Sequence, residues 1–449
     1  MTISEKINLQ LFAANDTVHS TEGFVNANAN TVESYNGQGL SPEMKTFYDK
    51  TLVELATPNL VHTQFAQKRP IPPHGGKTVE FRRMKPLAKN LNTITEGITP
   101  KGAKMTVVPL TATLNQYGDY IEQTDLIEMT AIDNTVIEAT KLLADQAGRT
   151  IDTIVRDVLQ TDTNVNYASV NDGTKLTPAD SRAMLDENAK LRVVDVFKAA
   201  AQLKAVNAPT IDGKYVAIVH PHVAFDLMQE SGDAWVDIKK YAEPEKILSG
   251  ELGTLGGVRF VESSEAKINY GKDLCEASRT LTPTAYKSNG TATVSANGGS
   301  SSPYQLTVSE GITTDLIGRA IQYFDASEDK GIIFNVIGVN VESKTIFADA
   351  DLGVTYASGD MLFPGEGGKK GLASYSTIFL GRDAYGIIDI NGTGTVEHIV
   401  KQRGYGNDPL NQRSSIGWKA FMCAAILADD YILRVESGSS FSGDVAEAN

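Results

Sequence analysis

The chain of 449 residues has few cysteines and no long hydrophobic run. Cys275 and Cys423 lie far apart in the sequence, so they form no metal-binding pattern, and we expect two buried, reduced thiols. The longest apolar run, Ala420 to Ala428, ends at Asp429 and Asp430. It is much shorter than the roughly 20 residues that a membrane-spanning helix needs. The sequence therefore predicts neither a disulfide-stapled scaffold nor an integral membrane protein.

An excess of positive charge is also missing. The formal net charge is −14, which argues against a protein that coats nucleic acid with its whole surface. One segment differs, because residues 66–105 carry nine basic and two acidic side chains, whereas the rest of the chain has a net charge of −21. We expect this basic segment to contact the acidic surface of another copy of the protein. A solvated basic hairpin is the alternative.

No complete motif for catalysis or nucleotide binding is present. Gly76, Lys77 and Thr78 match the end of a phosphate-binding loop, but Ile71 stands where its first glycine should be. The alternating residues that follow Lys77 predict a strand, whereas a phosphate-binding loop opens a helix. The G-x-S-x-G motif of a nucleophile elbow is absent. We therefore predict that the protein is not an enzyme, with no catalytic residue and no cofactor.

Three further patterns are incomplete. His220 and His222 lack a third metal ligand nearby in the sequence. Asp349, Asp351 and Asp360 follow a calcium-loop spacing, but the glycine that the loop requires at its sixth position is missing. The glycines of residues 250–257 do not have the G-x-G-x-x-G spacing and precede a strand. No metal site is predicted.

Local patterns predict the organisation of the first 160 residues. Residues 13–40 are rich in Asn, Thr, Ser and Gly without hydrophobic periodicity, which is typical of an arm that is ordered only on a partner. Apolar residues three and four apart predict a helix over 41–66, and a long basic hairpin follows, with its returning strand at 105–120. A capping box at Thr135 begins a periodic helix that runs to Gln160, about 39 Å at 1.5 Å per residue. One face of this helix is marked by apolar residues three and four apart: Val136, Ala139, Leu143, Ala147, Ile151, Ile154 and Val158.

The second half of the chain alternates between helices and strands. We expect helices at 193–204 and 221–229 and strands at 215–220 and 258–263. Residues 264–371 differ, because Gly, Ser and Thr increase and short alternating runs indicate an inserted β-rich domain. The α/β pattern resumes at about residue 374 and continues to 436.

Several motifs resemble one protein family. "SGELGTLGGVRFVESSEA" (249–266), "GRDAYG" (381–386) and "GYGNDPLNQRSSIGWKAFMCAAIL" (404–427) are similar, in this order, to segments of the N4 gp56-type major capsid proteins of tailed bacteriophages. The opening "INLQLFA" also resembles the start of many phage virion proteins. The resemblance covers roughly residues 1–266 and 372–440, and the insertion has no counterpart.

The resemblance implies an α+β fold of the HK97 capsid type. Its parts would be an N-terminal arm and helix (1–65), an extended loop (66–115), a peripheral domain (116–190) with the spine helix 135–160, an axial domain (191–263 and 372–449, with the final residues as a tail and a part returning to the peripheral domain) and the inserted β-rich domain (264–371). The extended loop would reach over a neighbouring subunit. Its contact residues would be Lys68, Arg69, Lys77, Arg82, Arg83, Lys85 and Lys89, with Gly75 and Gly76 as flexible points.

The function that the resemblance implies is that of a major capsid protein, which self-assembles into the icosahedral shell around double-stranded DNA. Its partners would be copies of itself in pentamers and hexamers, together with scaffold, portal and decoration proteins. The DNA would be enclosed without sequence-specific binding, and no membrane would be involved. The location would be the virion capsid, assembled in the host cytoplasm. The alternatives are an encapsulin-like cellular compartment shell of the same fold and a non-viral α/β enzyme or adhesin.

Overall fold

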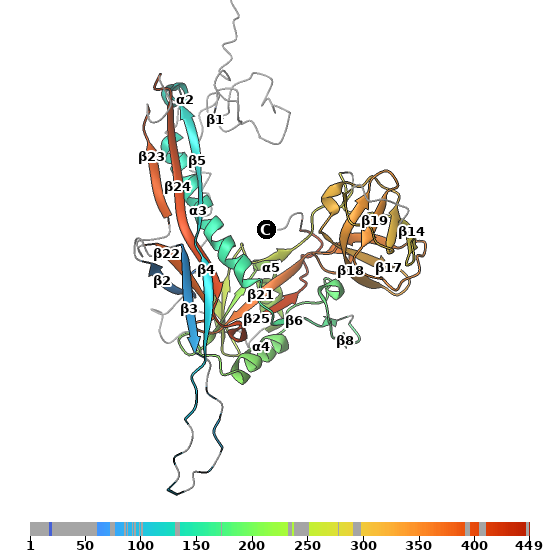
Figure 1. Cartoon of the computed structure of the whole chain (residues 1–449), viewed down its shortest axis with the longest axis horizontal. Coiled ribbons are helices and arrows are strands. Elements are labelled where there is room, and N and C mark those ends of the chain that lie inside the picture. Colours follow the sequence, from blue (N-terminus) through green and yellow to red (C-terminus); the bar gives the residue numbers. More distant parts are fainter. Residues whose placement is uncertain are drawn as a thin grey trace, which may run out of the picture. The chain divides into compact units, whose positions relative to one another are not determined.

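The structure is a computed structural model that describes residues 18–19, 61–71, 77–84, 87, 89–91, 93, 96–97, 99, 102–130, 135–171, 173–231, 236–237, 251–276, 278–290, 298–390, 396–403, 410–445 and 449. The chain divides into unit 1 (Met1–Leu60, Ala66–Val155 and Tyr385–Leu427) and unit 2 (Val61–Phe65, Arg156–Ala384 and Ala428–Asn449). Figure 1 draws the elements of both units. Among the described residues, no helix is both long and apolar enough to cross a bilayer.

Unit 1 contains a six-stranded sheet arranged around one long strand, β24 (Arg413–Ile426). On one side β24 pairs antiparallel with β5 (Asn115–Thr124), and on the other it pairs with β23 (Val396–Lys401) and β22 (Tyr385–Ile390). The outer strands are β1 (Val18–His19), parallel to β5, and β2 (Gln67–Ile71), parallel to β22.

Two glycines allow β5 and β24 to lie close together. A Cβ atom on Gly118 would lie 2.7 Å from the carbonyl oxygen of Trp418, and one on Gly417 would lie 2.9 Å from that of Asp119. Trp418 itself is buried, and its indole N–H donates a hydrogen bond of 3.1 Å to Gln146. These contacts give a physical reason for Gly417 and Trp418 in the motif at 404–427.

The predicted helix over 135–160 is confirmed as α3 (Thr135–Leu159). Its buried apolar residues are spaced four apart: Ala139, Leu143, Ala147, Ile151, Val155 and Leu159. A shorter helix, α2 (Asp125–Thr130), follows β5 directly. The backbone N–H of Asp125 donates to the carbonyl oxygen of Gln412, which ties the start of α2 to the segment before β24.

Unit 2 has an eight-stranded sheet. Its strand order is β10 (Val236–Asp237), β11 (Glu251–Leu255), β12 (Val258–Glu262), β9 (Tyr215–Val219), β21 (Ser374–Leu380), β25 (Ile432–Ser437) and β6 (Val165–Tyr167), and β13 (Ile268–Asn269) pairs with β21. Two helices, α4 (Val193–Ala205) and α5 (Pro221–Ser231), pack into the hydrophobic core of this sheet. The predicted helices and strands over 193–263 are thereby confirmed.

The glycines before β12 form a tight hairpin turn. Gly256 and Gly257 have φ values of 61° and 84°, and they are the only residues between β11 and β12. Two consecutive positive φ angles match the hairpin turn that suits the twist of the flanking strands, and glycine adopts them without strain. Glu251 and Arg259 of the two strands form a buried ion pair at 3.9 Å.

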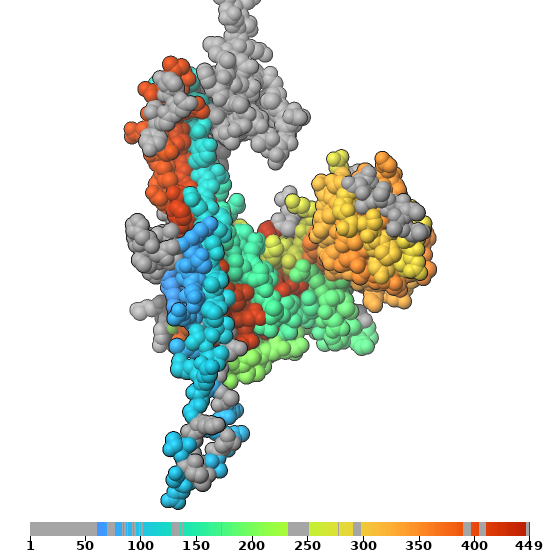
Figure 2. All heavy atoms as spheres, viewed as in Figure 1, coloured from blue at the N-terminus to red at the C-terminus, as the bar shows by residue number. Residues whose placement is uncertain are grey.

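Residues 283–364 form a small barrel of antiparallel strands. The order is β14 (Pro283–Lys287), β16 (Gln305–Val308), β19 (Thr345–Ala348), β18 (Lys330–Asn340), β17 (Ala320–Asp325) and β20 (Met361–Pro364), and β15 (Gly298–Gly299) pairs with β18. Leu281, just before β14, exchanges hydrogen bonds of 3.1 and 2.8 Å with Leu362 of β20, which closes the sheet on itself. The barrel has its own hydrophobic core, and Figure 2 shows it as a compact body in yellow and orange.

Some boundaries differ from the prediction. Residues 264–270 were assigned to the insertion, but β13 pairs with β21 of the unit 2 sheet, so the barrel begins later. Residues 372–449 were assigned with 191–263 apart from a part expected to return to the peripheral domain, and in the structure Tyr385–Leu427 belongs to unit 1. The predicted helix over 41–66 and the arm over 13–40 lie outside the described residues, apart from β1 and a turn over 61–66.

Candidate assembly surface

The strongest candidate surface is the hairpin of β3 (Thr78–Met84) and β4 (Val107–Thr113), which lie side by side in Figure 1. Phe81, Ala112 and Leu114 are buried in a small core with Ile388 and Cys423 of the unit 1 sheet. The base of the hairpin is therefore anchored within unit 1. A two-stranded hairpin has little stability of its own, so its outer part needs a partner.

Beyond this anchor the hairpin exposes large apolar side chains. Leu91 is 89% exposed, and the other members of the set are Met84, Leu87, Met105, Val107 and Val108. Gathered exposed apolar side chains mark interaction surfaces, whereas single ones are ordinary. The surface of the hairpin is therefore both basic and apolar.

Sequence reasoning found the charge of the hairpin but missed its apolar side chains. Met84, Leu87 and Leu91 are spaced three and four apart among lysines and asparagines. This spacing in a segment that contains proline and glycine does not match the apolar pattern of a buried strand. It was therefore a signal that could have revealed the exposed apolar side chains of the hairpin.

The predicted contact residues fall into separate groups. Lys68 and Arg69 lie on β2, which pairs with β22, so they belong to the unit 1 sheet and not to the free part of the hairpin. The Arg69 guanidinium lies 5.8 Å from the ring centroid of Phe81. Arg82 on β3 is exposed and pairs with Glu80 at 3.0 Å, and Lys77 and Lys89 are exposed.

The other predicted residues are described less completely. Arg83 lies on β3, but its side chain is outside the described part of the structure. Lys85, Gly75 and Gly76 lie outside the described residues altogether. The structure therefore brings Lys77, Arg82 and Lys89 onto the same hairpin and places Lys68 and Arg69 on a neighbouring strand.

The two histidines noted in the sequence form a hydrogen-bonded pair at the start of α5. The backbone N–H of His222 donates to Nδ1 of His220 at 3.2 Å, and Nδ1 of His222 lies 2.7 Å from the hydroxyl of Tyr375. Burial lowers the pKa of His220 to about 4, so its ring is neutral at physiological pH. This arrangement orders the end of β9.

The three aspartates of the calcium-like spacing have separate protein partners. Asp349 accepts hydrogen bonds from Asn335, Asp351 accepts from the Tyr286 hydroxyl, and buried Asp360 accepts from the Tyr323 hydroxyl. Within the described ranges, no three His, Cys, Asp or Glu residues are grouped so that they could hold a metal ion. The aspartates instead fasten loops of the barrel.

Comparisons with known proteins agree with this architecture. Residues 107–271, from the start of β4 to the start of the β-rich segment, match the family model described as phage capsid protein. The match confirms the resemblance to phage capsid proteins, while the N4 gp56 subtype stays a prediction. Among proteins with curated descriptions, none is significantly similar in sequence.

Solved structures give the fold. The capsid of Ralstonia phage GP4 is similar with a TM-score of 0.51 at 11% identity, over 92% of this chain and 98% of that chain. The capsid of the cyanophage P-SCSP1u has a TM-score of 0.49 at 12% identity, over 94% of this chain and 99% of that chain. The chain has the HK97-type capsid fold, as predicted.

Proposed function

We propose that this protein is the major capsid protein of a tailed bacteriophage, which assembles into the icosahedral shell around a double-stranded DNA genome. The observation that carries the proposal is the match of residues 107–271 to the phage capsid model. The matched residues include β5, α3, α4, α5 and the β11–β12 turn, so the similarity covers elements of both units.

Each part of the fold has a place in this proposal. The hairpin is the outer portion of the extended loop, and the unit 1 sheet with α3 forms the peripheral domain. The eight-stranded sheet of unit 2 forms the axial domain, and the barrel is the insertion.

The partners in the proposed shell are first of all other copies of the chain, in pentamers and hexamers. The hairpin offers them a basic and apolar surface, while the rest of the chain has a charge of −21. Opposite charge favours correct encounter between copies, and apolar burial adds affinity. Many modest contacts, repeated around a shell, give strong assembly without a single large interface.

An acidic shell is also compatible with packaged DNA. Phosphate binding is driven by clustered lysines and arginines, so a chain of net charge −14 encloses DNA without tight or sequence-specific binding. We further propose that the protein has no enzymatic activity, and that scaffold, portal and decoration proteins act with it during assembly in the host cytoplasm.

Expression of the full chain, followed by cryo-electron microscopy of the purified material, tests the proposal. We expect closed shells of pentamers and hexamers in which each hairpin lies over a neighbouring subunit. Only monomers or open filaments, both alone and with the cognate scaffold protein, would contradict it. Shells that selectively enclose a protein cargo would favour the compartment alternative.

A further inference from the structure

The root of the barrel consists of two segments that join it to the unit 2 sheet. The entry linker is 270–276, and the exit linker, 365–373, includes the stretch "GEGGKKG". A glycine-rich sequence of this kind is typical of a flexible tether. In the structure, however, both linkers are held by hydrogen bonds and do not have the contacts of a flexible tether.

Arg279 connects the two linkers to each other. Its guanidinium donates hydrogen bonds of 2.9 Å to the carbonyl oxygen of Gly271 and 2.7 Å to that of Gly371. It also lies 3.4 Å from the ring centroid of Tyr270. The planar guanidinium of Arg279 thus holds the entry linker and the exit linker at a fixed separation.

Two more arginines extend this arrangement. Arg319, which precedes β17, donates to the carbonyl oxygens of Lys272 (2.6 Å) and Asp273 (2.8 Å) in the entry linker. Arg182, in the 3-10 helix η4 (Arg182–Met184), donates to the carbonyl oxygen of Glu366 at 3.1 Å. Arg182 also forms a two-bond pair with the buried carboxylate of Glu436 on β25, at 2.7 and 2.5 Å. The exit linker is therefore fastened to the sheet as well.

A fourth side chain, that of Gln322, joins strand β17 of the barrel to the η4 segment and to the exit linker. Gln322 of β17 is fully buried, donates to the carbonyl oxygen of Ala183 at 3.3 Å and accepts from the backbone N–H of Lys370 at 2.9 Å. The backbone N–H of Lys369 donates to the carbonyl oxygen of Leu185 at 2.7 Å. The segment around η4 thus contacts both the barrel and its exit linker.

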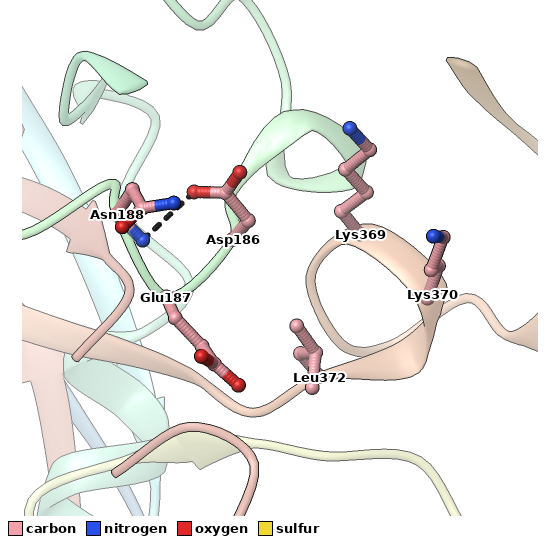
Figure 3. Close-up of a pocket in the computed structure, with 6 residues that line it drawn as sticks. All are labelled: Asp186, Glu187, Asn188, Lys369, Lys370 and Leu372. Carbon is pink, nitrogen blue, oxygen red and sulfur yellow. Dashed lines mark hydrogen bonds between the residues drawn. The ribbon is translucent and has the colours of Figure 1, made fainter. Parts of the chain in front are cut away.

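Figure 3 shows this junction from the side of a shallow pocket of about 210 Å³. Asp186, Glu187 and Asn188 line one side, and Lys369 and Lys370 line the other. The lysine side chains have partners on the barrel itself, since Lys369 pairs with Asp329 and Lys370 lies 4.7 Å from the ring centroid of Phe324. Because both lysines belong to the exit linker, their side chains add to the contacts that backbone groups, the arginines and Gln322 make at the junction.

Close packing explains the glycines of the exit linker. A Cβ atom on Gly368 would lie 2.4 Å from the carbonyl oxygen of Leu185. The glycine is needed here because the two backbones touch, and not because the linker must bend freely.

We propose that Arg182, Arg279, Arg319 and Gln322 form a brace that holds the barrel in one orientation on the unit 2 sheet. The barrel is then a rigid part of the subunit and not a tethered module. Within the described residues, five of the eight hydrogen bonds that the three guanidinium groups donate go to linker carbonyls, and the closed barrel has a hydrophobic core of its own. The inference rests on these contacts and does not depend on the proposed function.

Hydrogen exchange of the full, unassembled chain, read by mass spectrometry, tests the brace. The double variant Arg279→Gln/Arg319→Gln removes the contacts to the entry linker, to Gly371 and to the carboxylate of Glu366, which lies 3.5 Å from Arg319. We expect amide exchange in the exit linker, 365–373, to accelerate by about 10-fold to 100-fold, because its amides are hydrogen-bonded and each lost bond from a charged donor lowers the cost of local opening. Exchange in β17, β18 and β21 should stay at the parent rate.

Two further variants complete the test. Gln322→Ala cuts the contact to Ala183 without altering either linker sequence, and it should accelerate exchange in 365–373. Arg382→Gln removes an exposed arginine that pairs with neighbouring Asp383, and it should change neither linker. Parent-like linker exchange in the double variant would overturn the proposal. Loss of protection throughout β16 to β19 would also overturn it, because the arginines would then support the fold of the barrel and not its orientation.

Discussion

At the scale of single residues, Asp162 is an unusual buried carboxylate. Its side chain is fully buried, 3.6 Å from the Arg434 guanidinium, and neither of its oxygens has a hydrogen-bond partner among the described residues. Burial raises its pKa to about 6, against the opposing effect of Arg434, with Asp429 and Glu436 adding to the rise. The folded state therefore binds a proton that the unfolded state releases at a lower pH.

This pKa predicts a pH dependence of stability. Between about pH 4 and pH 6 the folded protein holds more protons at Asp162 than the unfolded chain, so the free energy of unfolding falls as the pH rises. Asp162→Asn should remove this contribution and stabilise unit 2 at pH 7.5 by up to about 3 kcal/mol, with little change at pH 4. Urea unfolding at both pH values checks this. A variant that is less stable at pH 7.5 would mean that the attraction to Arg434 outweighs the cost of burial.

Gly417 allows a second prediction at this scale. Its hydrogen faces the backbone of β5, where an added methyl group would lie 2.8 Å from Cβ of Tyr120. Gly417→Ala should destabilise unit 1 by about 1–3 kcal/mol because the strands must separate. Thermal unfolding measures the loss. The matched control is Gly311→Ala, since a Cβ atom there meets no atom within 4 Å, and equal melting temperatures for the two variants would contradict the prediction.

At the scale of elements, local patterns predicted the helices better than the pairing of strands. The periodic residues of α3 and α4 were visible in the sequence because each helix repeats its own buried face. On α3 the predicted face ran through Ile154 and Val158, whereas the fully buried positions are Val155 and Leu159, since a spacing of four drifts around the helix. The spacing of Met84, Leu87 and Leu91 matches no buried strand, but whether these side chains are exposed depends on tertiary contacts that the sequence does not reveal.

The contributions of the charged and of the apolar side chains of the hairpin to assembly can be distinguished by varying the salt concentration. Arg82→Glu/Arg83→Glu and Leu87→Ser/Leu91→Ser should each lower the yield of closed particles while the monomer stays folded by circular dichroism. The defect of the charge variant, relative to the parent, should shrink at high salt, since screening shortens the reach of charges from about 10 Å at 0.1 M to about 3 Å at 1 M. The defect of the apolar variant should persist.

A control for the apolar change is Val341→Ser, an exposed apolar residue of the barrel, which should assemble normally. Particle counts by negative-stain microscopy give the readout. Normal shells from both hairpin variants at low salt would show that the hairpin does not drive assembly.

At the scale of the whole molecule, the assignment of segments to units depended on contacts that no local pattern reveals. Tyr385–Leu427 begins soon after β21 of unit 2 in the chain, but its strands pair with β5 and β2 of unit 1. Closure of the barrel likewise rests on the bridge between Leu281 and Leu362, which are far apart in sequence. The β-rich character of the insertion followed from composition, but its boundary required the pairing of β13 with β21.

That boundary leads to a prediction about the insertion as a whole. Replacing 272–371 by a short Gly-Ser linker keeps β13, whose Ile268 and Asn269 pair with Tyr375 and Ser374. It also keeps the loop before β13, where the side chain of Asn449 bonds to the backbone of Ser264, Ala266 and Ile268. We expect this shortened chain to be soluble, with the unit 2 sheet intact by hydrogen exchange.

A second deletion, from 265 to 371, serves as the matched comparison, because it removes the same barrel together with β13. It takes away the carbonyl of Lys267 that accepts from Ser376, the carbonyl of Glu265 that accepts from buried Arg156, and two sites that hold Asn449. Leaving the Arg156 guanidinium buried with fewer acceptors costs on the order of 1–3 kcal/mol, and each lost backbone bond adds to this. The longer deletion should therefore unfold at a lower urea concentration than the shorter one. Equal midpoints would mean that β13 belongs with the barrel, and insoluble protein from the shorter deletion would mean that the barrel is part of the folding core of unit 2.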